Sequence, residues 1–156
     1  MHVSKAHEVF FRAFNALYAK LGGTASDIVI AHLTRTFCLP ILLYGLESLT
    51  VSRSYLNAIE FLLVQSRIFN IGSHDVINQV LYYTDILPLC YQIDLRKLRF
   101  YNIFQCCSDS IVWHILTATS KRTIDTLMAD YSVLTFSVDA VYLKAVWTKF
   151  GSELQL

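Results

Sequence analysis

The histidines, which most often carry catalysis or bind metals, are dispersed along this chain. They form no HExxH pattern and no pair at one-turn spacing, and they are His2, His7, His32, His74 and His114. Two histidines on one helix face are what a zinc site of that kind requires. His7 falls on the apolar face of the first predicted helix, and we interpret it as a packed or interfacial histidine. The histidine pattern therefore predicts no metal site.

The carboxylates are dispersed as well. Those of interest lie on separate predicted elements and are Asp75, Asp85, Asp94, Asp109, Asp125, Asp130 and Asp139. A two-metal site requires clustered carboxylates that hold the ions ~3.5–4 Å apart. Tyr83, Thr84 and Asp85 resemble a polymerase Tyr-x-Asp-Asp motif only superficially, because a single aspartate is present. The chain also lacks GxSxG, P-loop and GxGxxG motifs, so we predict no catalytic residues, no cofactor and no enzymatic activity for the isolated chain.

The four cysteines give an indication of the compartment. Cys38, Cys90, Cys106 and Cys107 contain no CxxC pair and have no histidine at ligand spacing. Adjacent cysteines such as Cys106 and Cys107 form only a strained, rare disulfide. We therefore expect buried free thiols in a reducing compartment, which makes the protein intracellular, either cytoplasmic or nuclear.

The basic residues are the remaining candidates for a functional site. The densest group is Arg96, Lys97 and Arg99, and the net charge of +1 means that any nucleic-acid binding has to be local. Phosphate binding requires cations on one accessible face. Arg96 and Arg99 meet that requirement one helical turn apart, whereas Lys97 points elsewhere. The alternative is a solvated polar strip on an otherwise buried helix.

The composition indicates an incomplete surface rather than a membrane protein. Apolar residues make up 54% of the chain and charged residues 16%, against an average of about 25% charged. The most apolar segment, from Ile28 to Leu46, is interrupted by His32, Arg35 and Pro40, and a spanning helix needs ~18 uncharged apolar residues. We therefore expect no membrane span, and a piece of a larger protein whose apolar faces meet a partner.

Apolar residues recur at three- and four-residue intervals, which predicts an all-α fold, an irregular bundle of about six to eight helices. The first helix runs from about Ser4 to Leu21, with Phe10 and Phe14 on its apolar face. It is expected to end in a left-handed glycine cap at Gly22 and Gly23. Further helices are predicted over 27–39, 40–48, 55–70, 75–83, 88–107, 109–119, 122–131 and 139–153. Pro40 is expected to open or kink a helix, so the helix over 27–39 is expected to end at a break there. Strands are the alternatives over 41–49 and 131–136.

The central run Pro40-Ile-Leu-Leu-Tyr-Gly-Leu-Glu47 carries a family resemblance. Its neighbours in order are Ala13-Phe14-Asn15 with Leu17, Arg67-Ile68-Phe69, Asp75 with Asn78, Val80 and Leu81, and Arg96-Lys-Leu98-Arg-Phe100. Together they resemble the region after the catalytic palm of non-LTR, LINE-like retrotransposon reverse transcriptases. Leu49 stands where members commonly have Trp, so the resemblance is to a diverged or truncated copy. It extends from about Lys5 to Phe104.

The resemblance implies a thumb-like helical part of an RNA-directed DNA polymerase, lacking the palm that holds the catalytic aspartates. Residues 1–107 would be the thumb-like region and 108–156 a C-terminal helical extension, together one compact unit. The partners implied are an RNA–DNA or template–primer duplex and the missing palm, or another protein, on the exposed apolar faces.

The resemblance also assigns roles to individual residues. Arg12, Arg96 and Arg99 would contact the nucleic-acid backbone. Arg67 would instead have a structural role. The residues assigned to the fold are Pro40, Leu42, Leu43, Tyr44, Gly45 and Glu47. Among them Tyr44 is expected to pack, Gly45 to allow close approach, and Glu47 to pair with an arginine or cap a helix. The alternative function is a helical protein–protein interaction module.

Overall fold

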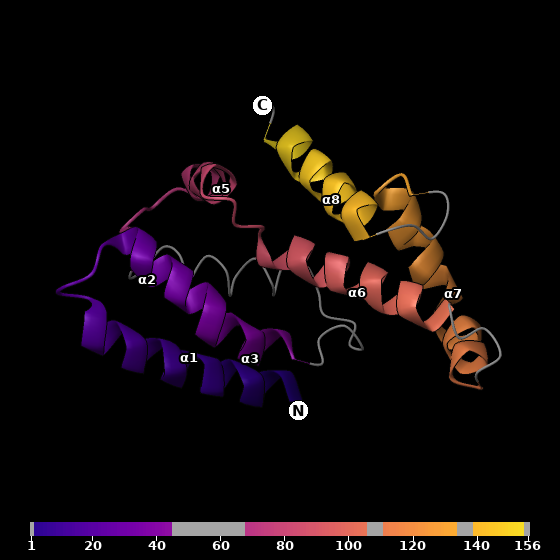
Figure 1. Cartoon of the computed structure of the whole chain (residues 1–156), viewed down its shortest axis with the longest axis horizontal. Coiled ribbons are helices and arrows are strands. Elements are labelled where there is room, and N and C mark those ends of the chain that lie inside the picture. Colours follow the sequence, from indigo (N-terminus) through magenta and orange to yellow (C-terminus); the bar gives the residue numbers. More distant parts are fainter. Residues whose placement is uncertain (1, 45–67, 106–110, 134–138, 155–156) are drawn as a thin grey trace. The chain divides into compact units, whose positions relative to one another are not determined.

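A computed structural model describes residues 2–44, 68–105, 111–133 and 139–154, and every regular element in these ranges is helical. The elements are α1 (His2–Leu21), α2 (Asp27–Leu33), the π-helical turn η1 (Thr34–Cys38), α3 (Leu39–Leu43), α5 (His74–Tyr83), α6 (Leu89–Gln105), α7 (Ile111–Asp130) and α8 (Asp139–Glu153) (Figure 1). The predicted all-α fold is confirmed. None of the described helices is both long and apolar enough to cross a membrane.

The chain packs as two compact units, Met1–Ile77 and Asn78–Leu156. The division falls within α5, about thirty residues before the functional boundary expected after Cys107. That expected boundary followed the extent of the resemblance rather than packing, and it stays a prediction.

In the first unit, α1 lies along the rod formed by α2, η1 and α3 (Figure 1). Phe10 and Phe14 are buried on the face of α1 that the periodicity predicted, with their rings stacked 6.3 Å apart. The helix does not end in the expected left-handed cap, because neither Gly22 nor Gly23 has a positive φ. Instead the Gly22 N–H donates to the Tyr18 carbonyl at 2.7 Å, and a Cβ on Gly22 would lie 2.7 Å from that oxygen. Glycine is required there for close approach.

The rod continues past Pro40, where a break was expected. In a regular α-helix the proline ring clashes with the carbonyl four residues earlier. Here the preceding turn is widened, because the Leu39 N–H donates to the carbonyl of Thr34, five residues back. The widened turn has a second effect. Four buried residues of the rod, Ile30, Thr34, Cys38 and Leu42, recur every four residues.

At 3.6 residues per turn, a four-residue repeat drifts by about 40° per step around an α-helix. The π turn offsets part of that drift, so the buried stripe keeps facing α1. The Thr34 hydroxyl, which lies in this stripe, donates to the Ile30 carbonyl at 2.8 Å, so its burial leaves no polar group unsatisfied.

The central run ends the rod. Leu42 and Leu43 are buried, whereas Tyr44 is 86% exposed, so the expected packing of Tyr44 is wrong. The reason is local: the backbone turns extended at Tyr44, which ends α3 and takes the ring off the buried face. Gly45 and Glu47 lie outside the described residues, as do Arg67 and most of the helix expected over 55–70.

In the second unit, α6 packs against both α7 and α8 (Figure 1). The bounds of α8 are those predicted. The two helices predicted over 109–119 and 122–131 are one helix, α7, because the residues between them include no glycine or proline to end it. Tyr131 and Ser132 form a turn after α7, so the strand alternative does not hold over 131–133, the described part of that range.

Three contacts fix α8 and the turn after α7 on α6. Tyr142 is fully buried, and its hydroxyl lies 3.3 Å from the Asn102 carboxamide oxygen. The Tyr131 hydroxyl donates to Asp94 at 2.6 Å. Phe150 packs its ring 5.2 Å from that of Tyr91. The backbones of α8 and the turn are therefore held in a defined arrangement on α6.

Candidate functional site

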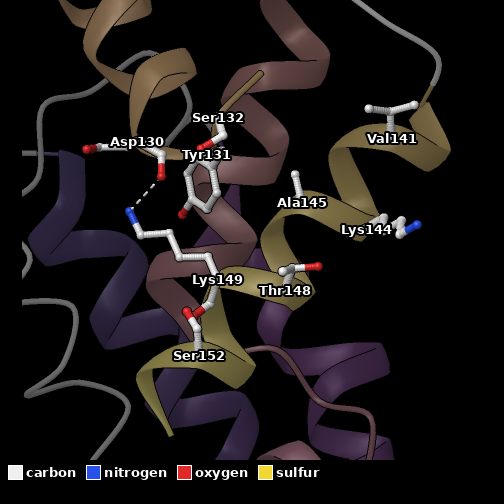
Figure 2. Close-up of a pocket in the computed structure, with 9 residues that line it drawn as sticks. All are labelled: Asp130, Tyr131, Ser132, Val141, Lys144, Ala145, Thr148, Lys149 and Ser152. Carbon is white, nitrogen blue, oxygen red and sulfur yellow. Dashed lines mark hydrogen bonds between the residues drawn. The ribbon is translucent and has the colours of Figure 1, made fainter. Parts of the chain in front are cut away.

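An open pocket of about 460 Å³ lies between α8 and the turn that follows α7. The turn contributes Asp130, Tyr131 and Ser132, and the solvent-facing side of α8 contributes Val141, Lys144, Ala145, Thr148, Lys149 and Ser152 (Figure 2). These α8 residues recur at three- and four-residue spacing, which places them on one side of the helix. The lining therefore combines two ammonium groups, four hydroxyls and one carboxylate around a small apolar floor.

Lys149 is held in place by the turn. Its ammonium group donates to the Asp130 carbonyl at 3.1 Å and lies 4.8 Å from the centre of the Tyr131 ring. That carbonyl belongs to the last residue of α7, where the partial negative charge of the helix is concentrated, so a cation is favourable there. An ammonium group carries three donors, and the contact with Asp130 uses one of them. Lys149 therefore keeps donors for a ligand.

Lys144 occupies the other side of the pocket. Its side chain is exposed, and it has no ion-pair partner among the residues that the structure describes. Thr148, one turn further along α8, is exposed beside it (Figure 2). An ammonium group and a hydroxyl at this spacing can bind an anion from one face of a helix.

Ser132 has a left-handed backbone at φ 54°, which is uncommon for a residue other than glycine. The cause is a Schellman turn, in which the Val133 N–H donates to the Met128 carbonyl at 2.9 Å and the Ser132 N–H to the Ala129 carbonyl at 3.0 Å. The turn places the Ser132 side chain at the pocket, where its hydroxyl is a further donor.

The three arginines predicted to contact nucleic acid are not brought together. Arg12 belongs to the first unit, is exposed, and pairs with Glu8 one turn earlier at 3.0 Å. Arg99 forms a two-pronged ion pair with Asp139, in which Nη2 donates to Oδ2 at 2.8 Å and Nε donates to Oδ1. This pair joins α6 to the first residue of α8. Both guanidinium groups therefore already have a carboxylate partner within the protein.

Arg96 differs from these two. It is half-buried on α6, and no carboxylate among the described residues lies within ion-pair distance of it. Lys97, the next residue, is also half-buried and has no ion pair with a described residue. Of the predicted contacts, Arg96 is the one whose charge is not already neutralised by a described carboxylate.

The structure tests the cysteine and metal predictions only for the residues that it describes. Cys38 and Cys90 are buried thiols outside any disulfide, as expected, whereas Cys106 and Cys107 lie outside the described residues. Burial raises the pKa of the Cys38 thiol, which favours the protonated form at neutral pH. Across the described residues, no cluster of three or more histidines, cysteines or carboxylates could hold a metal ion.

Comparisons with known proteins found no match to the chain among protein-family profiles, curated proteins or solved structures.

Sequence reasoning missed Lys144 and Lys149. It favoured Arg96 and Arg99 because they belong to the densest basic group and lie one helical turn apart on one face. The spacing of Lys144 and Thr148 was a usable signal, since residues four apart share a helix face. The pocket itself depends on the Schellman turn after α7. At that point the sequence predicts only the end of a separate short helix.

Proposed function

We propose that this chain is a thumb-like helical part of a non-LTR retrotransposon reverse transcriptase, which contacts a template–primer duplex through the phosphate backbone and carries no catalytic site of its own. The observation that carries the proposal is the central run Pro40–Glu47, in its order with the neighbouring segments from Lys5 to Phe104. An RNA–DNA hybrid has a wide, shallow minor groove, so contact of this kind follows shape and backbone rather than sequence.

Two structural features support this proposal. The described elements are all helical, as a thumb requires. Cationic side chains without a described carboxylate partner occur on α6 and α8 in the second unit, at Arg96 and Lys144. These are the groups that could replace the counterions of a nucleic-acid backbone.

Filter binding of the purified chain to a short RNA–DNA hybrid, at several salt concentrations, tests the contact. We expect binding that weakens as salt rises and that falls in Arg96→Ala. Arg122→Ala is the matched control, because Arg122 is exposed on α7 of the same unit and the change removes the same charge. Binding that is undetectable for the wild-type chain would contradict the contact, and so would equal losses in the two variants.

The genomic sequence upstream tests the parentage separately. A Tyr-x-Asp-Asp motif there, in frame or displaced by a frameshift, is the expected result. A complete, unrelated reading frame immediately upstream would count against the proposal.

A second candidate function, a protein-interaction module, is favoured by one observation. The α2–α3 rod exposes large apolar side chains, with Ile28 65%, Phe37 63% and Tyr44 86% exposed. Light scattering coupled to sizing chromatography distinguishes the two candidates. A stoichiometric dimer that does not bind nucleic acid, and that dissociates when Phe37→Ser is introduced, would favour the interaction module. A monomer that binds the hybrid would favour the thumb.

A further inference from the structure

The pocket between α8 and the turn after α7 has lysines on opposite sides. In Figure 2 the ammonium groups of Lys144 and Lys149 extend to opposite sides of the view, and Tyr131, Ala145 and Thr148 are seen between them. The two ammonium groups therefore point away from each other rather than toward a common point. The arrangement instead suits an elongated ligand with more than one negative group.

The charges in the pocket favour a polyanion. Two lysines and one aspartate line it, which leaves an excess of one positive charge. The Asp130 side chain extends away from Lys144 in Figure 2, so the Lys144 side of the pocket is the more positive one. The hydroxyls of Ser132 and Thr148 add neutral donors, and neutral donors beside cations are common contacts to phosphate oxygens.

The floor of the pocket is apolar and shallow. Val141 and Ala145 line it from α8, and Val141 is 45% exposed. Such a surface can lie against the sugar between two phosphates, but the pocket has no deep slot for a base. The pocket therefore suits the sugar–phosphate backbone of a nucleic acid rather than its bases.

We propose that this pocket binds two successive phosphates of a nucleic-acid strand. One phosphate contacts Lys144 and Thr148, and the next contacts Lys149, which keeps its anchoring contacts to Asp130 and Tyr131. This inference rests on the proposed function, since it specifies where in the second unit the backbone lies. It assigns the contact to α8, in addition to the predicted Arg96 on α6.

The test compares Lys144→Gln and Lys144→Arg with wild type for binding to an RNA–DNA hybrid at 0.1 M salt. A phosphate contact contributes about 0.7 to 0.9 to the slope of log affinity against log salt, which is about five- to eightfold in affinity at that concentration. We expect Lys144→Gln to lose about that factor and Lys144→Arg to lose little. Lys5→Gln, an exposed lysine on α1 of the other unit, is the control and should bind as wild type does.

Lys149 is not varied, because its contacts with Asp130 and Tyr131 stabilise the turn and its loss would confuse folding with binding. Amide chemical shifts provide the second readout. On addition of the hybrid we expect the largest changes at residues 130–132 and 144–149.

The outcomes separate the two proposals. Wild-type binding with an unchanged Lys144→Gln affinity and no shifts in these residues would overturn the pocket assignment and leave the proposed function standing. No binding by the wild-type chain would overturn both. Saturation of the pocket by inorganic phosphate alone, with no effect of Lys144→Gln on hybrid binding, would assign the site to a free phosphate and contradict the inference.

Discussion

Removal of the Arg99–Asp139 ion pair should destabilise the second unit and leave nucleic-acid binding nearly unchanged. The pair is two-pronged and joins α6 to the N-terminus of α8. The side chains are 42% and 59% exposed, so water screens the attraction. Exposed pairs contribute about 0.2–1 kcal/mol, and two-pronged geometry favours the upper part of that range. We therefore expect a coupling free energy of about 0.5–1 kcal/mol.

The two single variants should differ. Asp139 is the first residue of α8, where a carboxylate also interacts with the helix N-terminus for about 0.3–1 kcal/mol. Asp139→Ala loses both contributions, about 1–2 kcal/mol in all, whereas Arg99→Ala loses the ion pair alone. The difference between the two single variants is therefore about 0.3–1 kcal/mol.

Urea unfolding of wild type, Arg99→Ala, Asp139→Ala and the double variant measures these quantities as a double-mutant cycle. Tryptophan fluorescence is the suitable signal, because both tryptophans, Trp113 and Trp147, belong to the second unit. A coupling free energy below about 0.2 kcal/mol, the lower limit for such pairs, would refute the reasoning. So would a loss of hybrid binding in Arg99→Ala as large as that in Arg96→Ala with stability unchanged.

Three further changes test the packing. Ser132→Gly should stabilise the chain by roughly 0.5–1 kcal/mol in thermal unfolding, because glycine adopts the left-handed turn without strain; a lower melting temperature would contradict this. Gly22→Ala should destabilise the first unit by roughly 1 kcal/mol or more, because its Cβ meets the Tyr18 carbonyl, and an unchanged urea midpoint would be the opposing result. Burial raises the pKa of Cys38 and Tyr101, so the unfolded chain loses these protons first and the free energy of unfolding should fall as pH rises above about 9. A flat profile between pH 8 and roughly 10.5 would exclude that linkage.

The helical periodicity predicted most of the described elements, because an amphipathic face recurs whether or not its partner is known. Phe10 and Phe14 were placed on the buried face of α1, and α8 was given its observed bounds. Such predictions need only local sequence, which is why they hold without any knowledge of the packing.

The failures occur where distant or backbone-specific contacts decide the structure. Pro40 was expected to break the rod, but the helix continues because the turn before it is a widened π turn. Nothing in the composition of the sequence marks such a turn. Arg99 was predicted as a nucleic-acid contact because it lies one helical turn from Arg96, and the sequence did not show that its partner is Asp139, 40 residues away. Only the arrangement of α6 and α8 shows that pairing.

The pocket could not be predicted from the sequence for the same reason. Its two sides come from the turn after α7 and from α8, and a separate short helix was predicted to end near that turn. Lys144 and Lys149 carry no motif, so their common site follows only from the folded second unit.

The salt dependence of RNA–DNA hybrid binding by the wild-type chain tests the central claim most directly. If Arg96, Lys144 and Lys149 each neutralise one phosphate, log affinity should fall against log salt with a slope of about −2.7. A slope near zero, or no measurable affinity at low salt, would show that these cations do not contact a nucleic-acid backbone.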